Sequence, residues 1–219
     1  MVTGADLPSD GGGDRDSQPS SRDGRLIAVL EEAQRWGFLG PRPVREHVVH
    51  AERLVPALPA VGLVIDLGSG GGVPALVLAL HRPTLGWVLV ESRERRATWL
   101  CEAVARAGIA ATVEVRHERA ETTGRGPLRG AGSVVTARSF AAPGVTAECA
   151  APLLAPGGRL WVAEPPAPSV ERWPSKPMHE LGLRALPPSV PSWAGFEAVR
   201  PCPERYPRAV GVPSKRPLF

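Results

Sequence analysis

The sequence has little of what marks an exported, membrane-spanning or metal-binding protein. Its three cysteines, Cys101, Cys149 and Cys202, are far apart and form no CxxC pair, which favours neither a disulfide framework nor a zinc site. The apolar run from Val73 to Leu80 is far too short to span a bilayer. Since the N-terminus also has no apolar signal core, we expect a protein of the reducing cytoplasm without a membrane association.

Lysine is scarce, and arginine carries almost all of the positive charge. Only Lys176 and Lys215 are lysines among 26 basic residues, and the formal net charge is +4. The segment from Arg200 to Phe219 holds five basic residues against the single acid Glu204. This excess predicts either a solvated, flexible end or a patch that binds phosphate groups. The five histidines show no spacing typical of metal ligands, and we expect no metal.

The length of 219 residues and an apolar fraction of 43% suit one globular domain with short additions. Residues 1–22 are rich in Gly, Ser and Asp, and we expect them to be disordered. Residues 23–219 are expected to form the domain. It comprises a helical cap at 23–60, a cofactor-binding core at 61–164, and a Pro-rich linker with a basic C-terminal segment at 165–219.

Strands alternate with helices in this core, which predicts an α/β fold with a mostly parallel sheet between helices. The expected strands are Leu63–Leu67, Trp87–Val90, Thr112–Val115, Ser133–Thr136 and Arg159–Ala163. The expected helices are Arg25–Trp36, Val44–Val55, Val73–His81, one around Ala97–Ala105 that ends at Gly108, and Val145–Leu154. Beyond residue 165 we expect a short helix around Met178–Leu186, and Phe196–Val199 and Ala209–Val212 are candidates for two last strands.

A glycine-dense loop follows the first expected strand. The sequence Asp66-Leu-Gly-Ser-Gly-Gly-Gly72 links an apolar strand to a helix start, an arrangement that commonly holds a nucleotide-like cofactor. A dinucleotide fingerprint requires GxGxxG, but Val73 stands where the third glycine would be. The spacing of Asp66, Gly68 and Gly70 suits S-adenosylmethionine better. Glu91, at the end of the second strand, can accept hydrogen bonds from both ribose hydroxyls in either cofactor class.

Several motifs together resemble those of one family. They are Asp66 to Pro74, Glu91-Ser-Arg-Glu-Arg-Arg96 with Trp99-Leu100, Arg119-Ala-Glu121, Thr136-Ala-Arg-Ser-Phe-Ala141, Pro152 to Gly158, and the tail from Arg205 to Leu218. In this order, over roughly residues 25–219, they resemble the bacterial RsmG (GidB) family, which methylates N7 of a guanine in 16S ribosomal RNA. The resemblance implies a Rossmann-like class I S-adenosylmethionine-dependent methyltransferase with an N-terminal helical extension.

The resemblance also implies roles for residues. It implies contacts to S-adenosyl-L-methionine at Gly68, Val73, Ala120, Glu121 and Arg138, to which the loop spacing adds Asp66 and Gly70 and the ribose argument adds Glu91. The expected RNA contacts are Arg95, Arg96, Arg205, Arg208, Lys215 and Arg216. No catalytic residue is assigned, because the in-plane lone pair of guanine N7 attacks a sulfonium methyl group without a general base. The implied partner is 16S ribosomal RNA or the small ribosomal subunit, and we expect a monomer.

Other interpretations remain open at this point. Val73 also fits a core position at a helix start, and Arg95 with Arg96 also fits a solvated helix face. Family members usually carry Lys-Gly after the fifth strand, whereas this chain has Glu164-Pro165. This departure leaves two alternatives: a methyltransferase of small molecules on the same fold, or a cofactor-binding paralogue without activity.

Overall fold

The structure is a computed structural model that describes residues 22–219. The predicted disordered tail lies outside the described residues, except for Arg22, where the first helix begins. No helix in the described part is long and apolar enough to cross a membrane.

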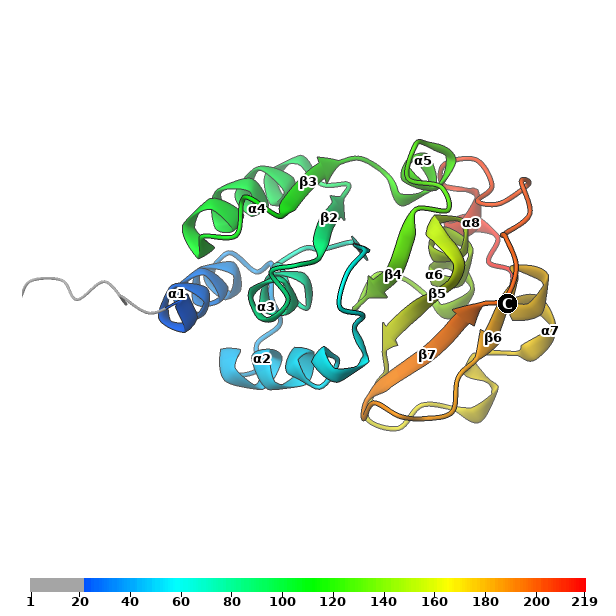
Figure 1. The fold of residues 1–219 in the computed structure, drawn as a ribbon, viewed down its shortest axis with the longest axis horizontal. Helices are drawn as coiled ribbons and strands as arrows, with labels where there is room; N and C mark the ends of the chain where they lie inside the picture. Colours follow the sequence, from blue (N-terminus) through cyan, green and yellow to red (C-terminus); the bar gives the residue numbers. More distant parts are fainter. Residues whose placement is uncertain (1–21) are drawn as a thin grey trace, which may run out of the picture.

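A single seven-stranded sheet runs through the molecule in the order β3-β2-β1-β4-β5-β7-β6 (Figure 1). The first five strands are parallel to their neighbours, whereas β7 pairs antiparallel with both β5 and β6. The strands are β1 Leu63–Leu67, β2 Gly86–Glu91, β3 Val113–His117, β4 Gly132–Ala137, β5 Leu154–Ala163, β6 Leu183–Ala185 and β7 Trp193–Ala198. The predicted α/β sheet, mostly parallel, is confirmed.

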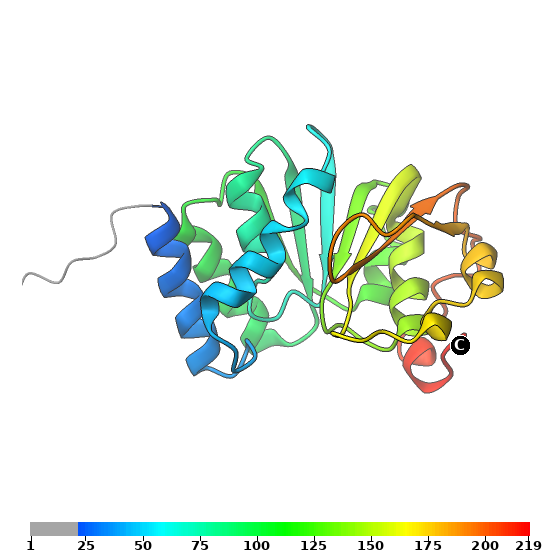
Figure 2. The same ribbon diagram turned by 90° about the horizontal axis from the view of Figure 1, so that it is seen from below.

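Helices cover both faces of this sheet (Figures 1 and 2). One face carries α1 Arg22–Arg35, α2 Val44–Glu52, α3 Ala75–His81 and α4 Glu94–Ala107, and the other carries α5 Ala120–Arg125, α6 Pro143–Ala150, α7 Ser175–Glu180 and α8 Val212–Lys215. Three short 3-10 helices are η1 Val55–Ala57, η2 Ala151–Leu153 and η3 Val170–Arg172. The predicted N-terminal helical extension is α1 with α2.

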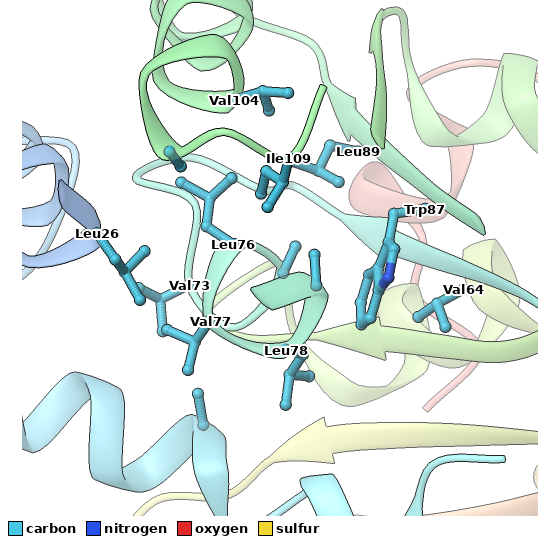
Figure 3. Packing of buried hydrophobic residues seen from close by; sticks show 14 of the residues in the cluster. Leu26, Val64, Val73, Leu76, Val77, Leu78, Trp87, Leu89, Val104 and Ile109 are labelled. Atoms are coloured by element: carbon cyan, nitrogen blue, oxygen red, sulfur yellow. The ribbon is translucent and has the colours of Figure 1, made fainter. Parts of the chain in front are cut away.

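Alternation along the strands divides the core into two clusters. Val64 and Trp87 pack with helices α1 to α4, and Figure 3 shows them among side chains such as Leu76 and Leu89. Their respective chain neighbours, Ile65 and Val88, point to the opposite cluster, under α5, α6 and α7. Successive strand residues point to opposite faces, so the inner strands β1, β2 and β4 are buried on both sides, whereas the edge strand β3 is partly exposed.

The C-terminal third differs from the sequence prediction. The segment expected to be a linker contributes β6 to the sheet, whereas the strand expected at Phe196–Val199 is present as β7, Trp193–Ala198. The helix expected at Met178–Leu186 ends at Glu180, because Gly182 adopts a left-handed φ of 85° and Leu183 starts β6. The expected helix was therefore right for Met178–Glu180 and wrong for the residues after Glu180.

Three smaller differences concern local geometry. Ala209–Val212 is not a strand, because Gly211 adopts a φ of 81° and its N–H group donates to a side chain. The turn expected at 156–158 lies inside the longer β5. The helix α5 was not predicted, since its six residues, Ala120–Arg125, are too few for a periodic signal.

A buried ion pair fastens the tail to the domain. The Glu148 carboxylate on α6 is fully buried, and it accepts hydrogen bonds from the backbone N–H, Nε and Nη2 of Arg208 at 2.8, 2.8 and 2.6 Å. These bonds raise the pKa of Arg208. The contact gives Arg208 a structural role that its sequence position did not indicate.

We predict that Arg208→Ala destabilises the protein by about 3–5 kcal/mol, because it leaves the Glu148 charge buried without a partner. Urea unfolding of the variant and the wild type measures this difference. Arg184→Ala is the matched control, since Arg184 forms an ion pair with Glu197 but is 67% exposed, and its loss costs about 1 kcal/mol or less. Equal effects of the two substitutions would contradict the structural role of Arg208.

Candidate functional site

The candidate site lies where the strand order reverses. The chain passes from β1 to β2 on one side and reaches β4 on the other, and ligands of open α/β sheets bind beyond the carboxyl ends of the strands at such a point. Two loops meet there: the glycine loop 68–72 after β1, and the segment Arg138–Ala141 after β4.

The glycine loop requires glycine at two positions for separate reasons. Gly68 has a φ of 66°, and a Cβ there would lie 2.7 Å from Cδ2 of Phe140. At Gly71 a Cβ would lie 2.8 Å from the carbonyl oxygen of Phe38. The loop is therefore packed tightly between the segment that follows α1 and the segment that follows β4, and a side chain at either glycine would displace a neighbour.

Glu91 holds this loop in place. Its buried carboxylate accepts hydrogen bonds from the backbone N–H of Gly70 at 3.0 Å and from that of Arg93 at 2.8 Å. A carboxylate has about four lone-pair sites, so both oxygens keep acceptor capacity for a pair of ribose hydroxyls. The geometry thus fits the role that the sequence predicted for Glu91.

The smaller of two cavities opens beside this carboxylate. Its volume is about 330 Å³, at the lower end of the range for small-ligand pockets. Four of the eight residues expected to contact the cofactor line it, namely Gly68, Glu91, Ala120 and Glu121. Its charged lining is balanced, with the acids Glu91, Glu118 and Glu121 and the bases Arg93, Arg96 and Arg119. A balanced lining suits a ligand that carries charges of both signs.

Glu121 connects this cavity to the C-terminal tail. Its Oε1 accepts a hydrogen bond from the backbone N–H of Gly211 at 3.0 Å, and Ser214 also lines the cavity. Burial opposes ionisation of Glu121, but the Gly211 N–H group and Arg119 outweigh burial and lower its pKa. Glu121 is therefore a carboxylate.

The other four predicted cofactor residues, Asp66, Gly70, Val73 and Arg138, do not line the smaller cavity. Gly70 is in the loop and contacts Glu91, whereas Asp66 is buried beneath the loop. Val73 is part of the apolar core at the start of α3. Arg138 lines the larger cavity instead. Their roles in binding the cofactor stay predictions.

Asp66 is fully buried on β1, beside Thr136 of β4. Its Oδ1 accepts a hydrogen bond of 2.6 Å from Thr136 Oγ1, while its Oδ2 has no partner among the described residues. Burial raises the pKa of Asp66 to about 6, although the bond from Thr136 opposes the shift.

The larger cavity has a volume of about 1140 Å³ and lies between α2, the segment after β4 and the segment after β5. Its charged lining is positive, with five arginines against two glutamates: Arg42, Arg45, Arg53, Arg138 and Arg172, and Glu46 and Glu164. The first three, exposed on α2 and next to its ends, are called the rim arginines below. The two cavities share Ser139, Phe140 and Ala141 as a common wall.

Two neutral histidines lie on one side of the larger cavity. His47 Nδ1 accepts a hydrogen bond from Arg138 Nη2, and His47 Nε2 lies 3.1 Å from the carbonyl oxygen of Gly40. These partners assign the proton to Nε2. Burial lowers the pKa of His47, and it lowers the pKa of His50 to about 4, in both cases with a contribution from Arg138. Neither ring adds charge to the cavity near neutral pH.

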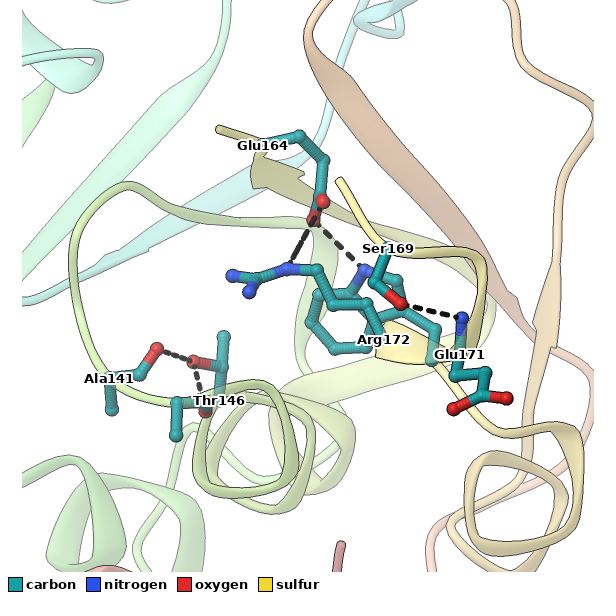
Figure 4. Close-up of polar contacts among 8 residues, drawn as sticks. Ala141, Thr146, Glu164, Ser169, Glu171 and Arg172 are labelled. Carbon is teal, nitrogen blue, oxygen red and sulfur yellow. Dashed lines mark hydrogen bonds and ion pairs between the residues drawn. The ribbon is translucent and has the colours of Figure 1, made fainter. Parts of the chain in front are cut away.

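Glu164, the acid that replaces the family's usual lysine, does not place a free negative charge in the larger cavity. Its side chain is only 7% exposed, and Arg172 Nε approaches it to 3.1 Å. Figure 4 shows the carboxylate directed at Arg172. It also accepts a hydrogen bond of 2.9 Å from the indole Nε1 of Trp173. Arg172 therefore restores the charge balance that the change from lysine to glutamate would disturb.

The predicted RNA contacts occupy different environments. Arg95 stacks over Trp36 with its guanidinium 4.6 Å from the ring centre, and Arg96 lines the smaller cavity. Arg205 lies over Tyr206 and Arg208 is paired with Glu148, while Lys215 and Arg216 are exposed at the end of α8. None of the six lines the larger cavity.

Sequence reasoning missed the rim arginines and the position of Phe140. Phe140 was part of a motif but received no role. The rim arginines follow no motif, and only the packing of α2 against α1 and α3 brings them to the cavity.

Solved structures identify the class of fold. A structure from Thermotoga maritima, described as a SAM-dependent O-methyltransferase, is similar with a TM-score of 0.55 and 14% identity, over 80% of this chain and 73% of that chain. The chain therefore has the class I S-adenosylmethionine-dependent methyltransferase fold, as the sequence predicted.

Sequence comparisons identify the family. The family model described as rRNA small subunit methyltransferase G (GidB) matches residues 41–164. Proteins named ribosomal RNA small subunit methyltransferase G are 42% identical over 133 residues in Salinispora tropica and 38% identical over 165 residues in Chloroflexus aggregans. These matches cover 57% and 71% of this chain, and 54% and 69% of the two relatives.

The family model covers more than half of the chain, so the chain belongs to the rRNA small subunit methyltransferase G family. The predicted family is confirmed, and S-adenosyl-L-methionine is the cofactor that the family and the fold imply.

We predict that Asp66 makes stability depend on pH. Because its pKa is raised to about 6 from 3.8, the native state binds a proton more tightly than the unfolded chain between these values. The free energy of unfolding therefore falls as the pH rises through this window. Asp66→Asn cannot ionise, so its stability relative to wild type rises by on the order of 3 kcal/mol from about pH 4 to about pH 7. Urea unfolding at several pH values measures this, and a constant difference between the two proteins would contradict the assignment.

Proposed function

We propose that this protein transfers the methyl group of S-adenosyl-L-methionine to N7 of a guanine in the 16S ribosomal RNA of the small ribosomal subunit. Its substrate is the RNA or the assembled subunit, and its working form is a monomer in the cytoplasm. The observation that carries the proposal, beside the family membership, is the pair of adjoining cavities with different charge. One is balanced and the other is positive, and they share a wall.

The smaller cavity fits the methyl donor. Glu91 offers two oxygens to the ribose hydroxyls, the backbone of Gly68 borders the cavity without a side chain, and Ala120 with Glu121 forms the wall beyond β3. When bound, the cofactor supplies an electrophilic methyl group. The protein's own contribution is to orient both reactants and to exclude water, because a guanine N7 needs no general base.

The larger cavity fits the acceptor. RNA brings one negative charge with each nucleotide, and arginine side chains are its usual phosphate contacts. The rim arginines Arg42 and Arg45 form no ion pair within the described residues, so both are available to phosphate groups. The neutral His47 and His50 add no charge that would oppose the positive charge that forms on a methylated base.

We predict that the wild-type protein transfers labelled methyl groups to small ribosomal subunits from a strain that lacks the modification, and that Gly68→Ala lowers this transfer when the cofactor concentration is limiting. Gly68 and Gly130 both have positive φ, 66° and 69°, but only at Gly68 does a Cβ meet another group, the ring of Phe140. We expect Gly68→Ala to weaken cofactor binding at least roughly tenfold, which corresponds to about 1.4 kcal/mol. Calorimetric titration with S-adenosyl-L-methionine measures this affinity.

Gly130→Ala is the matched control and retains wild-type affinity and activity. Subunits that accept no methyl group from the wild-type protein, while cofactor still binds, would overturn the proposed substrate and favour a small-molecule acceptor or an inactive protein. Comparison of naked 16S ribosomal RNA with subunits decides which form is the substrate.

We predict that the rim arginines bind the RNA backbone. The double substitution Arg42→Gln and Arg45→Gln removes two phosphate contacts. It raises KM for the subunit roughly tenfold and lowers the slope of log affinity against log salt by about 2, with unchanged cofactor affinity. Arg35→Gln with Arg159→Gln is the control of equal charge, because both residues are exposed and line neither cavity. Loss of RNA binding in Arg205→Gln with Arg216→Gln, but not in the rim variant, would assign the RNA to the tail instead.

A further inference from the structure

Phe140 occupies a special position between the two cavities. It follows β4 by three residues and lines both of them. Among the residues that line these cavities, it is the only phenylalanine, tyrosine or tryptophan. The imidazoles of His47 and His50 line the larger cavity alone, so Phe140 is the one aromatic ring that borders both cavities.

Gly68 of the glycine loop approaches this ring at its edge, while the partly buried ring also packs against the core cluster under α5, α6 and α7. A Cβ placed on Gly68 would lie 2.7 Å from Cδ2 of Phe140 and 3.6 Å from each of the two adjacent ring carbons, Cγ and Cε2. The distances to Cγ and Cε2 are equal to each other and much longer than the distance to Cδ2. The Cβ would therefore approach the ring within its plane and not from above one of its faces. Gly68 thus meets the ring edge. Phe140 also forms no aromatic or cation–π pair with the described residues.

The backbone on both sides of Phe140 has a defined local geometry, with an unusual φ angle before the residue and a hydrogen bond after it. Ser139, directly before Phe140, has a φ of 53°, and the one other non-glycine residue with positive φ in the described part, Ser192, also lines the larger cavity. Directly after Phe140, the carbonyl oxygen of Ala141 accepts a hydrogen bond of 3.1 Å from Thr146 Oγ1, as Figure 4 shows. Backbone strain of this kind persists where the surrounding structure fixes it, and it collects at functional sites.

We propose that the acceptor base stacks on the face of the Phe140 ring, inside the larger cavity, with its reacting edge toward the smaller one. This inference rests on the proposed function. Proteins that modify a base take it out of its stack and hold it against aromatic side chains. The guanidinium groups at the rim hold phosphates, whereas a flat, neutral base needs an apolar face, and Phe140 offers one at the wall that the two cavities share.

Stacking on this ring also favours the reaction itself. Methylation of N7 gives the base a positive charge, and the face of an aromatic ring attracts a cation through its quadrupole. The attraction grows as the charge develops, so it stabilises the transition state more than the bound substrate. Phe140 then acts as a substrate-contacting residue that affects both KM and kcat.

The test compares Phe140→Leu with Phe140→Tyr. Leucine keeps an apolar side chain but has no π face, whereas tyrosine keeps the face. We expect Phe140→Leu to lower kcat/KM for small subunits by on the order of tenfold to a hundredfold, with part of the loss in kcat, and Phe140→Tyr to stay within about threefold of wild type. Binding of subunits without cofactor, measured by sedimentation, is a second readout and weakens in Phe140→Leu alone.

Cofactor affinity and the thermal midpoint are measured for every variant, and both stay close to wild type if the ring serves the acceptor. Phe219→Leu is the matched control, because Phe219 is partly buried against the same core cluster as Phe140 but lines neither cavity. Equal transfer by Phe140→Leu and wild type would overturn the proposal, as would a parallel loss of cofactor affinity, which would assign the ring to the donor. Failure of the wild-type protein to methylate subunits is a separate result, since it removes the proposed function itself.

Discussion

The absence of a side chain at Gly68 is the constraint on which the two-cavity arrangement depends. Only a glycine allows the ring of Phe140 to come edge-on against the first loop of the sheet. This contact joins the ends of β1 and β4, which are neighbours in space but about 70 residues apart in the chain. With a larger residue the wall between the cavities would shift, and the distance between donor and acceptor would change with it.

Charge separates the tasks of the two cavities. The lining of the smaller cavity holds equal numbers of acids and bases, whereas arginines outnumber glutamates in the larger cavity. Glu164 is instructive here, because its replacement of the family's lysine suggests an altered substrate when only the sequence is considered. In the structure Arg172 neutralises it, so a change that looks functional from the sequence is compensated eight residues later.

The sequence predicted the features that depend on local pattern. The apolar strands β1 to β5, the glycine loop and Glu91 follow from hydrophobic runs, glycine spacing and the position of an acid at a strand end. The strand β6 and the end of α7 were not predicted, and β7 was predicted only in part. The strand β7 pairs antiparallel with β5 across 30 or more positions, and β6 pairs with β7, so neither depends on local pattern alone. Arg208 shows the same limit, since nothing near it in the sequence indicates that Glu148, 60 residues earlier, is buried and needs a cation.

Gln34 illustrates how an unremarkable side chain prepares a binding surface. From the end of α1 its Nε2 donates to the carbonyl oxygens of both Gly40 and Arg42, at 2.6 and 2.7 Å. The segment that carries Arg42 is thereby held in place in the free protein, so less conformational entropy would be lost if a phosphate group of the proposed RNA substrate bound there. Affinity at this edge of the protein is thus set partly by an amide group that never meets the ligand.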